Sequence, residues 1–150
     1  MSCMICDRIQ MHKDEINPYV VRELETGFVV IGDHQRFKGY TLFLCKQHVT
    51  ELHLLEENFK MTFLKEMSLV SEACFKAFNA DKMNIESLGN GEAHLHFHLF
   101  PRVDKDMPIR GPVWWTPKEE MYSEEFVVKD EELEDLKQRL SVELDKLFIK

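Results

Sequence analysis

The chain has 150 residues, of which 44% are hydrophobic and 31% are charged, and its formal net charge is -8. This length and composition are typical of one globular domain and exclude a disordered chain. The acidic balance argues against general nucleic-acid binding, because the phosphate backbone attracts basic surfaces, but it allows a small phosphorylated ligand in a locally positive pocket.

The sequence also indicates where the protein works. No run approaches the roughly 20 apolar residues that a membrane-spanning helix needs. The first eight residues, MSCMICDR, lack the apolar core of a secretory signal. We therefore expect a cytoplasmic protein with no membrane partner. There, the four cysteines are expected to be thiols or metal ligands rather than disulfides (Cys3, Cys6, Cys45 and Cys74).

The first half of the chain predicts three strands followed by one long helix. Residues 19–23, 28–31 and 40–45 are rich in valine and aromatic side chains, which favour strands, and glycine-containing turns separate them. From about residue 56 to residue 78, apolar side chains recur every three or four positions, which predicts an amphipathic helix. These side chains are Phe63, Leu64, Met67, Val70, Cys74 and Phe78.

The next predicted elements surround a histidine-rich run. Residues 83–88 are predicted as a strand and residues 89–91, Gly-Asn-Gly, as a turn. The histidine run that follows is predicted as a further strand that ends at Pro101.

The remainder of the chain is expected to be a loop and a helix. Residues from about 103 to 128, which contain both tryptophans, are expected to form an irregular ordered loop. A helix is expected at about 130–148, with Asp130 as its N-cap and leucines on one stripe. With no repeat and no linker, residues 1–150 are predicted to be one α+β domain with an antiparallel sheet of about five strands.

His94, His96 and His98 alternate with Leu95, Phe97 and Leu99. Successive side chains of a strand point to opposite faces, so this spacing predicts three imidazoles on one face and three apolar side chains toward the core. In a helix the same spacing would scatter the rings around the axis.

Three interpretations of these histidines remain open from the pattern alone. They could be an exposed cluster without a role, although each ring carries two nitrogens that need partners. They could together hold a catalytic metal ion that activates water. One imidazole could instead be a nucleophile whose neighbours fix its tautomer and donate protons.

The run from Gly89 to Arg102, GNGEAHLHFHLFPR, resembles the signature of the histidine triad (HIT) superfamily, His-x-His-x-His with apolar spacers followed by Pro-Arg. Upstream, KGYTLFL at 38–44 and Lys-Gln-His at 46–48 are similar to the family's Gly-His-Thr-Leu strand and Lys-x-His segment. The resemblance covers roughly residues 3–102. It implies a HIT-like fold and a nucleotide substrate.

The resemblance also implies roles for single residues. The middle histidine of the triad, here His96, would attack the α-phosphate and form a covalent nucleotidyl-histidine. His98 would lie beside that phosphate as a hydrogen-bond donor, and Asn90 would contact the phosphate or serve only as a turn residue. Relatives carry an acid or amide on the ribose hydroxyls, where this chain has Gly32; Asp33, one residue later, would take that role.

Cys3-Met4-Ile5-Cys6 is a Cys-x-x-Cys pair, which alone is a weak signal for metal. Some bacterial HIT-like proteins join such a pair to the histidine of the Lys-x-His segment and the first triad histidine. That resemblance implies a structural zinc site of four residues (Cys3, Cys6, His48 and His94). Cys45 would be a substitute ligand.

The leading functional expectation is hydrolysis of a dinucleoside polyphosphate such as diadenosine tetraphosphate. Within the family the alternatives are a nucleoside phosphoramidase and a nucleotidyl transferase, and outside it a metal-dependent hydrolase or a non-enzymatic nucleotide sensor. The Trp114-Trp115 pair and Tyr122 would cover or stack on the base, or serve simply as a hydrophobic anchor. Family members commonly pair as homodimers, so a homodimer is expected.

Overall fold

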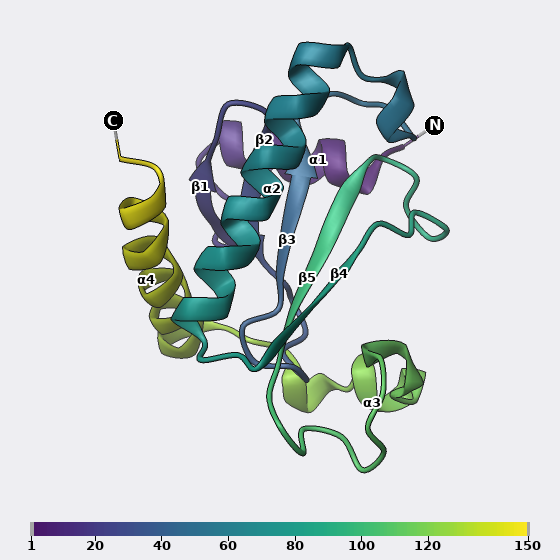
Figure 1. Cartoon of the computed structure of the whole chain (residues 1–150), viewed down its shortest axis with the longest axis vertical. Helices are drawn as coiled ribbons and strands as arrows, with labels where there is room; N and C mark the ends of the chain where they lie inside the picture. The colour runs from purple at the N-terminus through teal and green to yellow at the C-terminus, as the bar shows by residue number, and fades with distance from the viewer. Residues whose placement is uncertain (1, 150) are drawn as a thin grey trace.

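The computed structural model describes residues 2–149, which form a five-stranded antiparallel sheet with helices on both of its faces (Figure 1). The strand order is β1-β2-β3-β5-β4, so β5 lies between β3 and the edge strand β4. The predicted α+β fold is confirmed, with strands close to the expected ranges: β1 (Val20–Glu23), β2 (Gly27–Ile31), β3 (Thr41–Cys45), β4 (Lys82–Glu86) and β5 (His96–Arg102).

Two helices, α2 (Glu57–Ala77) and α4 (Asp130–Leu147), cover one face of the sheet, as Figure 1 shows. Phe63 of α2 stacks on Phe43 of β3, and Leu136 of α4 is fully buried in the same core. Both helices were predicted from their apolar periodicity. The predicted cap of α4 is wrong by one residue, because Asp130 is the first helical residue and Lys129 occupies the cap position.

A helix that the sequence did not predict, α1 (Met4–Lys13), lies on the opposite face. Its N-cap is Cys3, whose sulfur accepts a hydrogen bond from the Cys6 amide. Only Ile5 and Ile9 of this helix are buried, against the second face of β2 and β3. Because only these two side chains of the ten are buried, the helix carries too weak a periodic signal for a sequence-based prediction.

The segment from 103 to 128 is more regular than expected. It contains two short 3-10 helices, η2 (Val113–Trp115) and η3 (Glu124–Phe126), and a single-turn helix, α3 (Lys118–Met121). A further 3-10 turn, η1 (Leu52–Leu54), precedes α2. Within residues 2–149, every helix is too short or too polar to span a bilayer.

The prediction that Pro101 ends its strand is also wrong, since β5 continues to Arg102. Beyond Leu99, β5 pairs with β4 alone, because its pairing with β3 stops at Leu99. A proline, which lacks an amide donor, is tolerated where a strand has a neighbour on one side only.

Candidate active site and metal centre

Along β5 and the two residues before it, the histidines and the apolar side chains point to opposite faces of the sheet, as the alternation predicted. Leu95, Phe97 and Leu99 belong to the core under α2 and α4. His96 and His98 lie on the other face of the sheet, with their ring centroids 4.7 Å apart.

The His96 ring is held in one orientation by the backbone. Its Nδ1 lies 2.7 Å from the carbonyl oxygen of His94. A carbonyl oxygen can only accept, so Nδ1 must carry the proton and donate it. The neutral ring therefore has its unprotonated nitrogen, and with it the lone pair, at Nε2.

His98 completes a directional chain of hydrogen bonds. Its Nε2 lies 3.1 Å from Nε2 of His96, and its Nδ1 lies 2.7 Å from the hydroxyl of Tyr40. Since His96 Nε2 has no proton, His98 Nε2 must donate to it, and His98 Nδ1 must accept from Tyr40. Burial, and then the proximity of His96, lowers the pKa of His98 to about 4, which keeps the ring neutral at neutral pH.

The lowered pKa of His98 predicts a specific acid sensitivity of the fold. Below its ordinary pKa of 6.5 the unfolded chain binds a proton at this position, whereas the folded chain does so only near pH 4. The stability that the neutral ring contributes is therefore complete above pH 6.5 and is lost as the pH falls toward 4. We expect the unfolding free energy, measured by urea titration, to fall more steeply in wild type than in His98→Gln over this range. Parallel profiles would contradict the assignment.

Both rings face a cavity of about 540 Å³, a volume within the usual range for small-molecule sites. The walls come from α1, β2, β3, β5, the 88–92 turn and the segment after β5. Among the described residues that line it, Arg8 is the one lysine or arginine, against two carboxylates, Asp33 and Glu92.

Asp33 and Asn90 both line this cavity, as their predicted roles require. Asp33 is paired with Arg8 of α1, whose Nη2 lies 3.1 Å from the carboxylate. Asn90 is exposed in the turn before the histidine run. His34, which the sequence suggested was a surface residue without a role, also lines the cavity and packs edge-on against Tyr122.

Trp114 approaches His98 from the segment that follows β5, with the two rings edge to face at 6.1 Å. Its indole N–H donates to Glu86, which pairs with His98 across β4 and β5. Trp114 and Tyr122 line the cavity, whereas Trp115 is 62% exposed and is not among its lining residues. Of the three aromatic residues expected at the base, Trp114 and Tyr122 therefore line the cavity and Trp115 does not.

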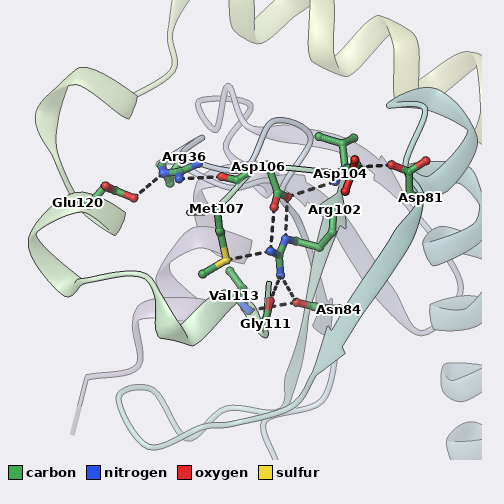
Figure 2. A network of polar contacts seen from close by, with 11 residues as sticks. Arg36, Asp81, Asn84, Arg102, Asp104, Asp106, Met107, Gly111, Val113 and Glu120 are labelled. Atoms are coloured by element: carbon green, nitrogen blue, oxygen red, sulfur yellow. Dashed lines mark hydrogen bonds and ion pairs between the residues drawn. The ribbon is translucent and has the colours of Figure 1, made fainter. Parts of the chain in front are cut away.

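Arg102, at the end of β5, fixes the path of this segment (Figure 2). Its guanidinium makes two hydrogen bonds to the Asp106 carboxylate and donates to the Asn84 side chain and the Gly111 carbonyl. The Val113 amide donates to the same Asn84 oxygen. Arg102 is only 8% exposed, so water competes little for these hydrogen bonds. They hold the segment that contains Val113 in place and so position the neighbouring Trp114 beside the triad.

On the N-terminal side of the triad, the four predicted metal ligands meet in space. Their donor atoms all lie within 4.8 Å of one another (Cys3, Cys6, His48 and His94). The His94 Nδ1 lies 3.4 Å from Cys3 Sγ, 3.5 Å from Cys6 Sγ and 3.2 Å from His48 Nδ1. The Cys6 Sγ lies 3.3 Å from His48 Nδ1.

These separations fit a tetrahedral zinc ion. Usual Zn–N and Zn–S bond lengths place two tetrahedral ligands about 3.3 Å apart for two nitrogens and about 3.6 Å apart for nitrogen and sulfur. His94 Nε2 lies 2.7 Å from the Cys45 carbonyl, so it carries the proton and leaves Nδ1 free to bind metal. Cys45 thus orients a ligand through its backbone, and its thiol is buried in the core rather than a substitute ligand.

The charges of the cluster also favour a cation. Burial, followed by the nearby Cys3, raises the pKa of Cys6 to about 11. A thiolate at Cys6 is therefore unfavourable here unless a metal ion neutralises it. Glu92, another residue not predicted from the sequence, closes the site by accepting hydrogen bonds from the amides of Met4 and His94.

The arrangement does not support a single metal site made of all three triad histidines. The Nδ1 of His94 faces the cysteines, that of His96 donates to the backbone, and that of His98 contacts Tyr40. The three rings therefore serve different partners.

Comparison with known proteins agrees with the geometry. Residues 13–105 match the model of the HIT domain. Adenosine 5′-monophosphoramidase HNT1 of Saccharomyces cerevisiae is 26% identical over 110 residues, which cover 69% of this chain and 65% of the yeast protein, just under two thirds.

Two crystal structures share the fold. A histidine triad protein from Sinorhizobium meliloti has a TM-score of 0.73 and 23% identity, with 83% of this chain and 88% of that chain covered. A Zn-bound histidine triad protein from Mycobacterium smegmatis has a TM-score of 0.68 and 19% identity, with 98% and 96% covered. The family match spans more than half of the sequence and includes the whole triad, so the chain belongs to the histidine triad family.

Proposed function

We propose that the protein hydrolyses a nucleotide at its α-phosphorus through a covalent nucleotidyl-histidine on His96. Membership of the histidine triad family supports a nucleotide-processing enzyme. The observation that carries the nucleophile assignment is the bond from His96 Nδ1–H to the His94 carbonyl, which leaves the Nε2 lone pair on the cavity side.

The reaction would take two steps. In the first, the His96 Nε2 lone pair attacks the α-phosphorus and an N–P bond forms. The bond to the leaving group breaks and its electrons stay on the leaving atom. That atom takes a proton from solvent and accepts a hydrogen bond from His98 Nε2–H, which is released from His96 as the N–P bond forms. The resulting cationic His96 ring keeps its Nδ1–H bond to the His94 carbonyl, which stabilises the charge.

In the second step, water attacks the same phosphorus. The N–P bond breaks, its electron pair returns to His96 Nε2, and the proton lost by water passes to solvent. Nucleoside monophosphate leaves, and His96 again accepts the hydrogen bond from His98 Nε2–H.

Two substrates are proposed, and the charge of the cavity distinguishes them. A dinucleoside polyphosphate such as diadenosine tetraphosphate carries several negative charges, whereas the cavity offers one arginine, already paired with Asp33, against two carboxylates. A nucleoside phosphoramidate carries less charge, and the similarity to the yeast phosphoramidase also favours it. The charge balance therefore favours the phosphoramidate.

The test is to incubate the purified protein with adenosine 5′-phosphoramidate and with diadenosine tetraphosphate and to separate the products by ion-exchange chromatography. Release of AMP from either substrate supports the hydrolase, and a higher kcat/KM with the phosphoramidate supports the charge argument. Tight nucleotide binding without product would instead support the nucleotide-sensor alternative. Transfer of the nucleotidyl group to an added phosphate acceptor, without AMP, would support the transferase.

We also propose that Asp33 binds the ribose hydroxyls. A carboxylate accepts two hydrogen bonds from a diol, and the pairing of Asp33 with Arg8 holds it toward the cavity. Asp33→Ala is expected to raise the Kd for AMP about tenfold or more, measured by calorimetry, because a charged hydrogen-bond partner is lost. The Kd for 2′,3′-dideoxy-AMP should hardly change, and an equal loss of affinity for both ligands would remove the ribose assignment.

The metal centre is proposed to hold a structural zinc ion. Cys3, Cys6, His48 and His94 would fill all four tetrahedral positions, so the ion would supply no open site for substrate. It would join the start of α1 to His94, two residues before β5, and so stabilise the position of His96.

The four unpaired cysteines are consistent with a reducing compartment, and we propose a cytoplasmic location with no nucleic-acid or membrane partner.

A homodimer is proposed on the free edge of the sheet. Among the strands of residues 2–149, β4 pairs with β5 alone, and Ile85 on β4 is 45% exposed. Met61 and Phe75 of the neighbouring helix α2 are also exposed. Sedimentation velocity is expected to show a dimer in wild type and a shift toward monomer in Ile85→Lys. A monomeric wild type at micromolar concentration would contradict the proposal.

A further inference from the structure

Tyr40 makes a direct hydrogen bond to the third triad histidine, His98, which nothing in the sequence predicted. It directly precedes β3, and its hydroxyl lies 2.7 Å from His98 Nδ1. Its ring stacks on Phe100 with the centroids 4.0 Å apart and the planes 5° apart. A Cβ at Gly32 would lie only 2.2 Å from the Tyr40 ring, so the glycine provides the space that the ring occupies.

The hydroxyl of Tyr40 acts as a donor with a fixed direction. Burial raises the pKa of Tyr40 far above its ordinary value, so the phenol keeps its proton at any pH at which the protein is folded. Its neighbour Nδ1 belongs to a neutral ring, whose other nitrogen must donate to His96. The phenol proton therefore points at His98 Nδ1 and occupies its lone pair.

The opposite tautomer of His98, with its proton on Nδ1, is unfavourable. If His98 carried its proton on Nδ1, its bare Nε2 would face the bare Nε2 of His96 at 3.1 Å, with no proton between two lone pairs. A neutral histidine in water exchanges freely between its two tautomers, so one of them must be selected by its surroundings. In this protein the selecting groups are Tyr40 on one side and His96 on the other.

We propose that Tyr40 is a positioning residue that holds His98 as the Nε2–H tautomer, so that the single proton of His98 faces the nucleophile and the leaving group. The inference rests on the proposed function for its catalytic consequence, but the tautomer itself can be observed without substrate. The hydroxyl acts through His98 and makes no step of its own.

The first test is ¹⁵N NMR of the histidine rings in the full-length protein with its metal bound. In wild type, His98 is expected to show a protonated Nε2 and an unprotonated, hydrogen-bonded Nδ1. In Tyr40→Phe, which keeps the ring and its stacking on Phe100, the Nδ1 signal of His98 should move toward that of the protonated form. A wild-type spectrum with a protonated Nδ1 would overturn the proposal without any variant.

The second test is kinetic. Tyr40→Phe should lower kcat about tenfold and leave KM within about twofold, because one hydrogen bond to a reacting group is lost and none to bound nucleotide. His98→Gln removes the ring through which Tyr40 acts, so in that background Tyr40→Phe should cause little further loss. A tenfold loss that persists in the His98→Gln background would overturn the proposal.

The two tests separate this inference from the proposed function. If wild type releases no AMP from either substrate, the hydrolase proposal fails, and the NMR result still decides the role of Tyr40. If hydrolysis is confirmed but the His98 signals are the same in wild type and Tyr40→Phe, only the positioning role is overturned. The thermal midpoint of each variant, measured beside these data, confirms that a folded protein is being compared.

Discussion

Replacing His96 with alanine is expected to abolish turnover, with kcat lowered on the order of 10⁴-fold or more. No other group on the cavity wall has the same combination of an unprotonated nitrogen and a ring fixed by a backbone carbonyl, among the described residues. Steady-state release of AMP from adenosine 5′-phosphoramidate is the measurement.

The matched control is His53→Ala, which removes an exposed histidine of η1 that lies outside the cavity. It should retain full activity. The affinity of His96→Ala for AMP should remain within a few-fold of wild type, because the ribose and base contacts are kept. Turnover close to wild type in His96→Ala would exclude His96 as the nucleophile and would favour another catalytic group.

The second large effect is expected from the metal centre. Cys6→Ser should lose the bound zinc and lower the thermal midpoint by about 10 °C. A structural ion at about 1,000 times its Kd contributes about 4 kcal/mol, and each kcal/mol shifts the midpoint by about 2–4 °C in a domain of this size. Metal content by mass spectrometry and thermal unfolding measured together test the expectation.

Cys74→Ala provides the control, because Cys74 is a fully buried core thiol of α2 outside the cluster. It should keep one zinc ion per chain even if packing costs some stability. A chelator added to wild type should remove zinc slowly and reduce activity only as the protein loses its structure. Immediate loss of turnover with the fold intact would indicate a catalytic metal instead.

Much of the site could be predicted because its signals are local. The alternation of His96 and His98 with Phe97 fixes which face each side chain takes, and the period-two rule needs only the strand. Cys3 and Cys6 are three residues apart, which one helical turn brings to the same side. The resemblance to zinc-binding HIT-like proteins then implied His48 and His94 as the other two ligands.

What the sequence did not reveal depends on contacts between distant segments. The bond from Tyr40 to His98 spans 58 positions, and nothing in a Gly-Tyr-Thr strand identifies the partner of its hydroxyl. The pairing of Arg8 with Asp33 requires α1, whose short apolar pattern was too weak to predict. Long-range polar contacts of this kind are set by packing rather than by periodicity.

The order of the loop after β5 also depends on long-range contacts that the sequence did not reveal. Its prolines and tryptophans indicated irregular structure, yet Arg102 orders it through the Asp106 carboxylate and the Gly111 carbonyl. The family-like Pro-Arg pair gave no indication that the arginine is buried and clamps the loop. As a result, the aromatic cover was expected from both tryptophans, whereas Trp114 alone reaches His98.

The most direct test of the account is mass spectrometry of the enzyme quenched with base during turnover of adenosine 5′-phosphoramidate, followed by peptide mapping. Alkaline quenching is chosen because an N–P bond to histidine is labile in acid. We expect a mass increase of one adenylyl group, located on the peptide that contains His96 and absent from His96→Ala. Rapid turnover with no adduct at any quench time, or an adduct on another residue, would contradict it.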